Sequence, residues 1–193
     1  MPSKPRYRES IRQMLEPGRP LDPGRVWQVV ELVDGQPRHI TELIECLWDE
    51  NVAVANRAGD ALERVTRENS AQAQRWKSEL LGLMGEVKEK KVRWNLALLV
   101  PRLQLTRPEC RRAAAAMRCY LDDPSSIVKT SALHGLADLT RQDASLLPEV
   151  LDLLRVAGRV GTPAMRARSR ILLKKLEQPE MRRRSGTSLH MFV

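Results

Sequence analysis

The chain has 193 residues, of which 42% are hydrophobic and 30% are charged, and its formal net charge is +9 at pH 7. This length fits one domain with a hydrophobic core or a short array of repeats, and it is too short for two ordinary domains. No run of about eighteen apolar residues occurs, and the N-terminal MPSKPRYRES lacks the apolar core of a signal peptide. We therefore expect a cytoplasmic protein without a membrane-bound segment.

Cysteine and histidine usage argues against a disulfide scaffold or a zinc site. Cys46, Cys110 and Cys119 are odd in number and form no C-x-x-C pair, and the chain has three histidines. We expect free thiols, no bound metal and no cofactor. The 33 basic residues comprise 25 Arg and 8 Lys, and such a surface would attract polyanions or acidic proteins.

Helical periodicity dominates the chain. Alternation of β-branched residues is nearly absent, whereas Ala, Leu, Arg and Glu recur at spacings of three and four, which predicts an all-α fold. The first predicted helix is amphipathic and basic, with Tyr7, Ile11 and Leu15 on one side. We expect residues 1–36 to form an N-terminal capping helix pair whose core is Ile11, Leu15, Val26, Val29 and Val30. Binding of the first helix to a membrane surface is the alternative.

Caps and turn-forming residues divide the remaining chain into helices. Thr106 followed by Glu109 predicts a capping box, and Thr162 followed by Pro163 predicts a helix cap with proline in the first turn. Further breaks are predicted at Gly35 and Pro37, Asp49 to Asn51, Asp122 to Pro124, Asp143 and Gly161.

Four of the predicted helices align with one another. VANRAGDALERV begins at Val54, VRWNLALLVPRL at Val92, VKTSALHGLADL at Val128 and MRARSRILLKKL at Met165, so the steps are 38, 36 and 37 residues. In all four, apolar or small residues fall at offsets 0, 4, 7, 8 and 11 from the start. Another apolar residue precedes each start by eleven positions, at Leu43, Leu81, Met117 and Leu154. The pattern predicts a repeating unit of an outer helix, a turn and an inner helix.

This repeat resembles the HEAT-repeat family, which pairs antiparallel helices around a D-x-x-x-x-V-R-like turn. DDPSSIVK at residues 122–129 is the nearest match, while the turn acid is absent before Val92 and the turn before Met165 reads GRVGTPA. The resemblance implies an armadillo-like, right-handed α-solenoid of about five stacked antiparallel helix pairs. Residues 37–177 would hold four HEAT-like repeats, and residues 178–193 would form a basic and apolar C-terminal tail.

A solenoid of this kind presents its inner helices as an extended face. The side of each inner helix opposite the core lies at offsets 2, 6 and 9, which gives Asn56, Asp60, Glu63; Trp94, Leu98, Pro101; Thr130, His134, Ala137; and Ala167, Ile171, Lys174. We expect this exposed stripe to be apolar at its centre and to have basic shoulders. Pro101 is expected to bend its helix.

An apolar stripe between basic shoulders suits an acidic protein or peptide. The predicted partner-binding residues are Arg57, Arg64, Arg93, Trp94, Leu98, Arg102, Lys129, His134, Arg166, Arg168, Arg170, Ile171, Lys174 and Lys175. The interpretation left open is that the arginines at offset 1 make hydrogen bonds between repeats and that the others are simply solvated.

The favoured function is a scaffold or adaptor without catalysis, and two alternatives remain. The same arginines would suit the phosphates of DNA or RNA, although Asp60, Glu63 and the scarcity of aromatic residues argue against it. Similar helical repeats also build alkylpurine DNA glycosylases, for which Trp94 with Asp60 or Asp138 would be the candidates. The chain has no P-loop, G-x-S-x-G or H-E-x-x-H motif, and we expect no catalytic residues.

The C-terminal segment supports two hypotheses. It combines the basic run Arg182 to Arg184 with four apolar residues near the end, Leu189, Met191, Phe192 and Val193. It would either fold back onto Ile171 and Leu172 to close the last repeat or serve as a docking peptide.

Overall fold

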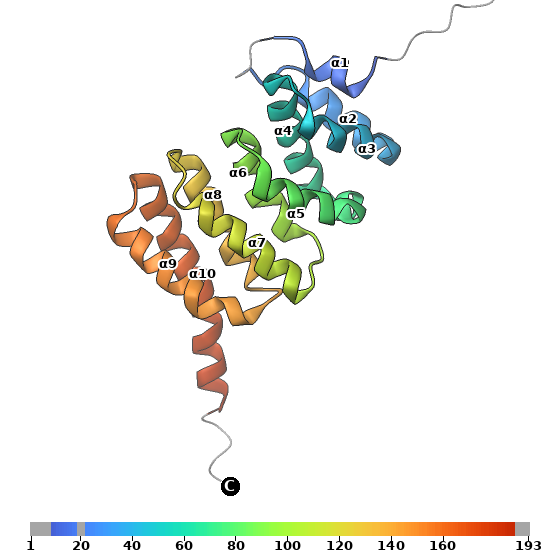
Figure 1. Ribbon diagram of the computed structural model, residues 1–193. Coiled ribbons are helices and arrows are strands. Elements are labelled where there is room, and N and C mark those ends of the chain that lie inside the picture. The colour runs from blue at the N-terminus through green and yellow to red at the C-terminus, as the bar shows by residue number, and fades with distance from the viewer. Residues whose placement is uncertain (1–8, 19–21, 188–193) are drawn as a thin grey trace, which may run out of the picture.

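The computed structural model describes residues 9–18 and 22–187, with side chains described up to residue 177. Every regular element in these ranges is helical, which confirms the predicted all-α class (Figure 1). In the first part of the chain these elements are α1 (Ile11–Leu15), α2 (Val26–Gly35), α3 (Ile40–Glu45) and α4 (Val52–Glu68), with 3₁₀ turns at Pro37–His39 and Cys46–Trp48.

The second part of the chain contains six further α-helices. They are α5 (Lys77–Glu86), α6 (Lys90–Leu99), α7 (Arg107–Tyr120), α8 (Ser126–Leu139), α9 (Leu147–Val160) and α10 (Pro163–Thr187). The 3₁₀ segments Ser70–Trp76, Val100–Arg102 and Ala144–Leu146 precede α5, follow α6 and precede α9. No helix in the described ranges is both long and apolar enough to cross a membrane.

Local sequence chemistry sets several helix starts. Thr106 accepts a hydrogen bond from the backbone N–H of Glu109, and the Glu109 carboxylate accepts one from the backbone N–H of Thr106 at 2.7 Å, so the predicted capping box is confirmed. Thr162 accepts from the N–H of Met165 at 3.4 Å, and Pro163 is the first residue of α10. Both helices therefore begin where the sequence predicts.

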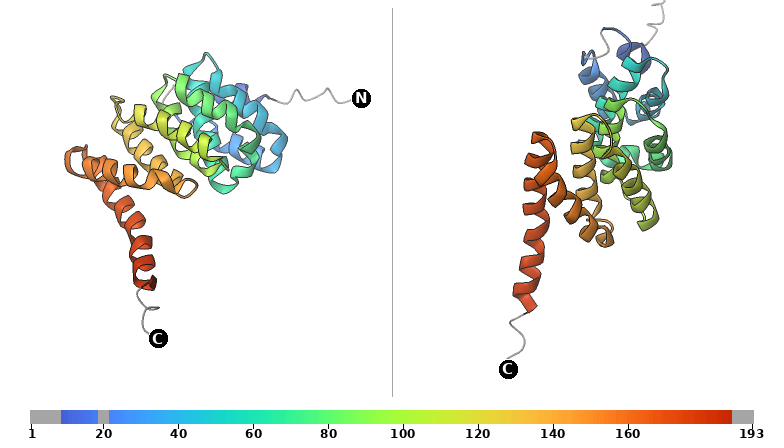
Figure 2. Two further views of the ribbon diagram at one scale, coloured as in Figure 1. Left: turned by 60° about the horizontal axis from the view of Figure 1, so that its bottom comes forward. Right: turned by 60° about the vertical axis from the view of Figure 1, so that its left-hand side comes forward.

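Helices of similar position in the repeat pack side by side. α2 contacts α4, α4 contacts α6, α6 contacts α8 and α8 contacts α10, while α5 contacts α7. Segments about 37 residues apart along the chain thus become neighbours (Figures 1 and 2). We call the layer formed by α4, α6, α8 and α10 the inner layer.

The predicted core offsets are the ones that the inner layer buries. All five positions are buried in α4, in α6 with its 3₁₀ extension, and in α8. In α10, Ser169 and Leu172 are buried, but Met165, Leu173 and Leu176 are only half-buried. α10 is the last helix of the layer, and its far side has no further described helix to pack against.

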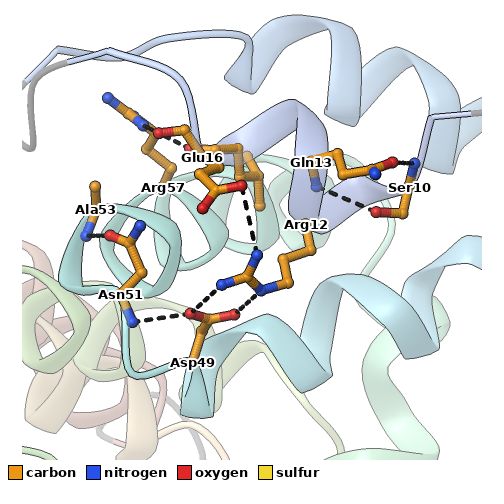
Figure 3. A network of polar contacts seen from close by, with 9 residues as sticks. Ser10, Arg12, Gln13, Glu16, Asp49, Asn51, Ala53 and Arg57 are labelled. Atoms are coloured by element: carbon orange, nitrogen blue, oxygen red, sulfur yellow. Dashed lines mark hydrogen bonds and ion pairs between the residues drawn. The ribbon is translucent and has the colours of Figure 1, made fainter.

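The N-terminal pair depends on a buried arginine. Arg57 of α4 is fully buried and donates hydrogen bonds to the backbone carbonyls of Leu15 at 2.5 Å, Glu16 at 3.2 Å and Asp22 at 2.9 Å. It therefore supplies donors to the C-terminal carbonyls of the five-residue helix α1 and to the turn that follows (Figure 3). The prediction that Arg57 binds a partner is wrong, because its side chain is fully buried and bonds carbonyl groups of the protein itself.

Two further contacts hold α1 against the α3 region. Arg12 pairs with Asp49 at 2.6 Å (Figure 3). The Glu42 carboxylate accepts a hydrogen bond from the N–H of Ile11 at 2.7 Å. Gly24 has φ +53° and lies so close to Arg57 that a Cβ there would be 3.0 Å from its Nε. The turn thus needs glycine for its left-handed backbone and for the room it leaves.

Pro101 ends a helix instead of bending it. α6 stops at Leu99, and the chain continues as the 3₁₀ turn Val100–Arg102, because proline has no N–H to donate to the carbonyl of Ala97. Pro101 is also buried rather than exposed. Gly135 of α8 packs against that same Ala97 carbonyl, so two helices of the inner layer approach unusually closely here.

The predicted boundary at residue 178 does not coincide with a helix end. α10 runs without interruption to Thr187, so the chain does not turn back toward Ile171 within residues 178–187. In Figure 2 its C-terminal half projects beyond the other helices. Leu189, Met191, Phe192 and Val193 lie outside the described residues.

We predict that Gly135→Ala destabilises the protein by about 3 kcal/mol, because the added methyl group would overlap the Ala97 carbonyl and lie 2.8 Å from Met117. Gly85→Ala is the control, since nothing lies within 4 Å of a Cβ there. It should leave stability unchanged or raise it by up to about 1 kcal/mol. Urea unfolding followed by circular dichroism measures both, and equal midpoints would contradict the close approach of α6 and α8.

We also predict that Arg57→Met costs about 3 kcal/mol, because buried carbonyls lose charged donors. Hydrogen exchange should locate the effect: amides of α1 and α2 should exchange faster while those of α8 keep their protection. Arg170→Met, at an exposed position of α10, is the matched control. Uniformly faster exchange in the Arg57 variant would show that Arg57 does not act on the N-terminal pair specifically.

Candidate binding site on the inner layer

The predicted exposed stripe is largely covered in the first three helices of the inner layer. Asn56, Glu63, Pro101 and Ala137 are buried, whereas the other five positions of these helices are half-buried. In α10 all three positions, Ala167, Ile171 and Lys174, are exposed. The prediction of exposure is therefore wrong at the four buried positions. In α4 the cause is that long side chains from α6 and the turn after it lie over the helix.

Two carboxylates of α4 show how the covering occurs. Asp60 is held by Lys91 at 2.5 Å and by the Asn95 amide at 2.9 Å, both from α6. Glu63 is held by Arg102, which follows α6, with a nitrogen–oxygen distance of 2.6 Å. These carboxylates thus serve the contact between α4 and α6.

Glu63 is the most constrained carboxylate of this face. Its side chain is only 7% exposed, and Arg67 of α4 binds its second oxygen at 2.6 Å. Arg102 also donates to the Glu63 backbone carbonyl at 2.7 Å. Burial on its own would raise the pKa of Glu63, but the hydrogen bonds from Arg102 and Arg67 outweigh burial and lower it. Glu63 is therefore a charged residue at neutral pH, with a positive side chain on either side.

A second polar group lies between α8 and α10. His134 and Asp138 are 3.4 Å apart at their nearest nitrogen and oxygen, and Lys175 of α10 reaches Asp138 at 3.4 Å. Burial lowers the pKa of His134, Asp138 raises it, and the positive charges of Arg168, Lys175 and Arg102 lower it further. The net direction is down, so burial together with these cations outweighs the adjacent carboxylate.

These groups meet around a cavity of about 270 Å³, which we call the arginine cavity. It is lined by Glu63, Arg67, Leu98, Arg102, Thr130, Ser131, His134 and Arg168, contributed by α4, α6, the 3₁₀ turn after α6, α8 and α10. Four predicted partner-binding residues, Leu98, Arg102, His134 and Arg168, are thus brought together. Sequence reasoning missed Arg67 and Ser131, although Arg67 follows Glu63 at the i+4 spacing of a helical ion pair.

The other predicted residues lie apart from this cavity. Arg93 donates to the Val87 carbonyl at 2.8 Å and pairs with Asp123 at 2.7 Å. It therefore makes a hydrogen bond between repeats, which was the alternative interpretation for the arginines at offset 1. Arg166 donates to the carbonyl of Gly161 within its own turn. Trp94 is half-buried against the hydrophobic core.

On the other helices, Arg64 of α4 lies over the exposed ring of Trp27 of α2 at 4.1 Å. Arg170, Ile171 and Lys174 are exposed on α10, and Lys175 pairs with Asp138. Lys129 lines a larger cavity of about 530 Å³ between the turns that precede α8 and α10. That cavity is mostly apolar, with Val156, Val160 and Met165 in its lining, and its charged residues are of both signs, Arg118, Asp122 and Lys129.

Catalytic arrangements receive no support from the described side chains. The candidates for a glycosylase, Trp94 with Asp60 or Asp138, do not line the arginine cavity. Lys91 engages Asp60, and Lys175 engages Asp138. Burial raises the pKa of Cys46 to about 12, which leaves its thiol a poor nucleophile. Among the described residues, no three His, Cys, Asp or Glu side chains group as metal ligands would.

Comparison with known proteins shows that the fold of this chain is similar to that of a solved structure. No family model matches the chain, and no curated protein matches it. The crystal structure of an engineered protein, a target of the Northeast Structural Genomics Consortium, is similar with a TM-score of 0.57 and 11% sequence identity. The match covers 87% of this chain and 78% of that chain. At this identity the likeness concerns the helical fold alone.

We predict that Arg168→Gln raises the pKa of His134, because removal of a positive charge makes protonation of the imidazole less unfavourable. Arg170→Gln removes the same charge from α10 outside the cavity lining and should shift this pKa less. Titration of the histidine ring signals by nuclear magnetic resonance measures both, with His134→Gln to assign the signal. Equal shifts in the two variants would contradict the placement of Arg168 beside His134.

Proposed function

We propose that this chain is a HEAT-like, right-handed α-solenoid of five helix pairs that acts as a non-catalytic scaffold or adaptor and binds an acidic protein segment on its inner layer. The proposed architecture is supported by the four aligned segments and by the contacts that link α4, α6, α8 and α10 in order. The binding function rests on one observation, the arginine cavity. It gathers three arginines and one glutamate from α4, the 3₁₀ turn after α6 and α10 around a recess.

The surface beside the cavity suits a protein segment with both charged and apolar residues. Arg168, Ile171 and Lys175 follow one another at helical spacings of three and four on α10, so they lie on one side of that helix. Ile171 is 60% exposed. An acidic side chain of the partner would enter the cavity while an adjacent apolar side chain covered Ile171.

Nucleic acid is the second candidate because the net charge is +9. A phosphate backbone attracts an uninterrupted track of cations. Here carboxylates lie between the cations of the inner layer. Asp60, Glu63 and Asp138 each form an ion pair with a lysine or arginine side chain. The pattern favours a ligand with one or two localised negative charges.

The expected result of peptide selection is enrichment of acidic peptides that contain an apolar residue. A displayed library of random 16-residue peptides would be selected on the full chain, and enriched peptides would be resynthesised with a fluorescent label. Charge reversal by Arg168→Glu should weaken their binding at least tenfold, on the order of 1.4 kcal/mol or more. Fluorescence anisotropy gives the dissociation constants.

Arg159→Glu, which reverses an exposed charge on α9, is the matched control and should bind almost as the parent chain does. Enrichment of basic or uncharged peptides would refute the proposal. So would duplex DNA that binds at low salt, is weakened by Arg168→Glu and displaces every selected peptide, because the inner layer would then be a nucleic-acid surface.

A further inference from the structure

The arginine cavity carries more positive charge than a single carboxylate would neutralise. Arg67, Arg102 and Arg168 line it against one carboxylate, Glu63, so its formal charge is two positive with His134 neutral. Outside the lining, Lys175 and Asp138 pair with each other and cancel. The cavity therefore matches a ligand group with two negative charges.

The three arginines differ in whether their guanidinium groups already bind another side chain of the protein. Arg67 and Arg102 both hold Glu63, whose two oxygens they occupy. Within the described part of the chain, Arg168 makes no hydrogen bond or ion pair, although it is half-buried at the cavity. A guanidinium presents five N–H donors in a fixed plane, and all five of Arg168 remain for a ligand, whereas Arg67 and Arg102 already use part of theirs on Glu63.

Hydroxyl groups complete one side of the cavity. Thr130 donates its hydroxyl hydrogen to the carbonyl of Ser126 at 2.7 Å, so it cannot donate to a ligand as well. Ser131 lines the cavity beside it and is 8% exposed. Its hydroxyl can donate to an anion, which adds a neutral donor to the charged ones.

We propose that the arginine cavity binds the phosphate of a phosphorylated serine or threonine in the partner segment. This inference rests on the proposed function and names the acidic group that the segment would place there. A phosphate monoester carries close to two negative charges at pH 7 and several strong acceptor oxygens, and arginine clusters bind such groups well. A carboxylate would leave one positive charge uncompensated.

Shape favours a phosphorylated side chain over a nucleic-acid backbone. The cavity is a recess bounded by four helices, and it admits one anionic group together with the start of the chain that carries it. On the α4 and α6 side of the cavity the cations are engaged by carboxylates, as Lys91 is by Asp60. A run of phosphodiesters that left the cavity in this direction would meet Asp60 and Glu63.

Phosphate binding should be coupled to protonation of His134. The charged groups around this imidazole are Asp138 on its own helix, Arg168 and Lys175 on α10, Arg102 after α6, and Glu63 and Arg67 on α4. Burial and the positive charges of Arg168, Lys175 and Arg102 lower its pKa, and a bound dianion adds negative charge beside the imidazole. Phosphate binding should therefore raise the pKa of His134.

The first experiment titrates the full chain with inorganic phosphate at constant ionic strength and follows the ring signals of His134. A saturable shift and a raised His134 pKa are expected in the parent chain and in Arg159→Gln, which removes an exposed charge from α9. Arg168→Gln should weaken binding at least fivefold. An absence of saturation, or equal weakening by the two arginine variants, would overturn the inference.

The second experiment compares one selected peptide in three forms, with aspartate, serine or phosphoserine at the position of its most important acid. The phosphoserine form should bind at least tenfold more tightly than the aspartate form, and Arg168→Gln should remove most of that difference. An aspartate form that binds as tightly as the phosphoserine form would overturn this inference and leave the proposed scaffold function intact. A short DNA duplex that displaces phosphate more effectively than the phosphopeptide would overturn both.

Discussion

Ion pairs between successive helices of the inner layer are the interaction on which the candidate site depends. Glu63 of α4 is buried, and a buried carboxylate is unfavourable unless cations and hydrogen bonds compensate its charge. Arg102, which lies 39 residues later, supplies this compensation. The same contact that joins two repeats therefore places a guanidinium at the arginine cavity, so packing and charge placement cannot be separated here.

The residues of α10 explain why positive charge collects on this helix. α4 carries Asp60 and Glu63 at offsets 6 and 9, where α10 carries Ile171 and Lys174. α10 thus contributes a cation to the preceding helix, as Lys175 does to Asp138, but presents no carboxylate at these offsets. The charge imbalance of the described surface follows from this difference between α4 and α10.

Much of the fold could be predicted from the sequence because its causes are local or periodic. The Thr106 cap lies within one helical turn of its partner, and the core offsets repeat every 36 to 38 residues. The site could be predicted only in part, because projecting one helix shows which way a side chain points and not what arrives from the next helix. Arg57 and Arg102 sit at the same kind of shoulder position, yet one is buried under α1 and the other lines the cavity. That difference depends on contacts 35 to 42 residues apart.

Pro101 and Gly135 both lie beside the Ala97 carbonyl, and this shared contact has a consequence for how the two positions evolve. Proline leaves the Ala97 carbonyl without its usual donor in the helix, and glycine lets the next helix approach that carbonyl. Pro101 ends α6 beside the Ala97 carbonyl, and Gly135 leaves room for α8 to lie against that carbonyl. A substitution of either residue therefore affects the packing of the other. Related chains should therefore keep or lose the two residues together, and a descendant with neither would have α6 and α8 separated by an ordinary helix-to-helix distance.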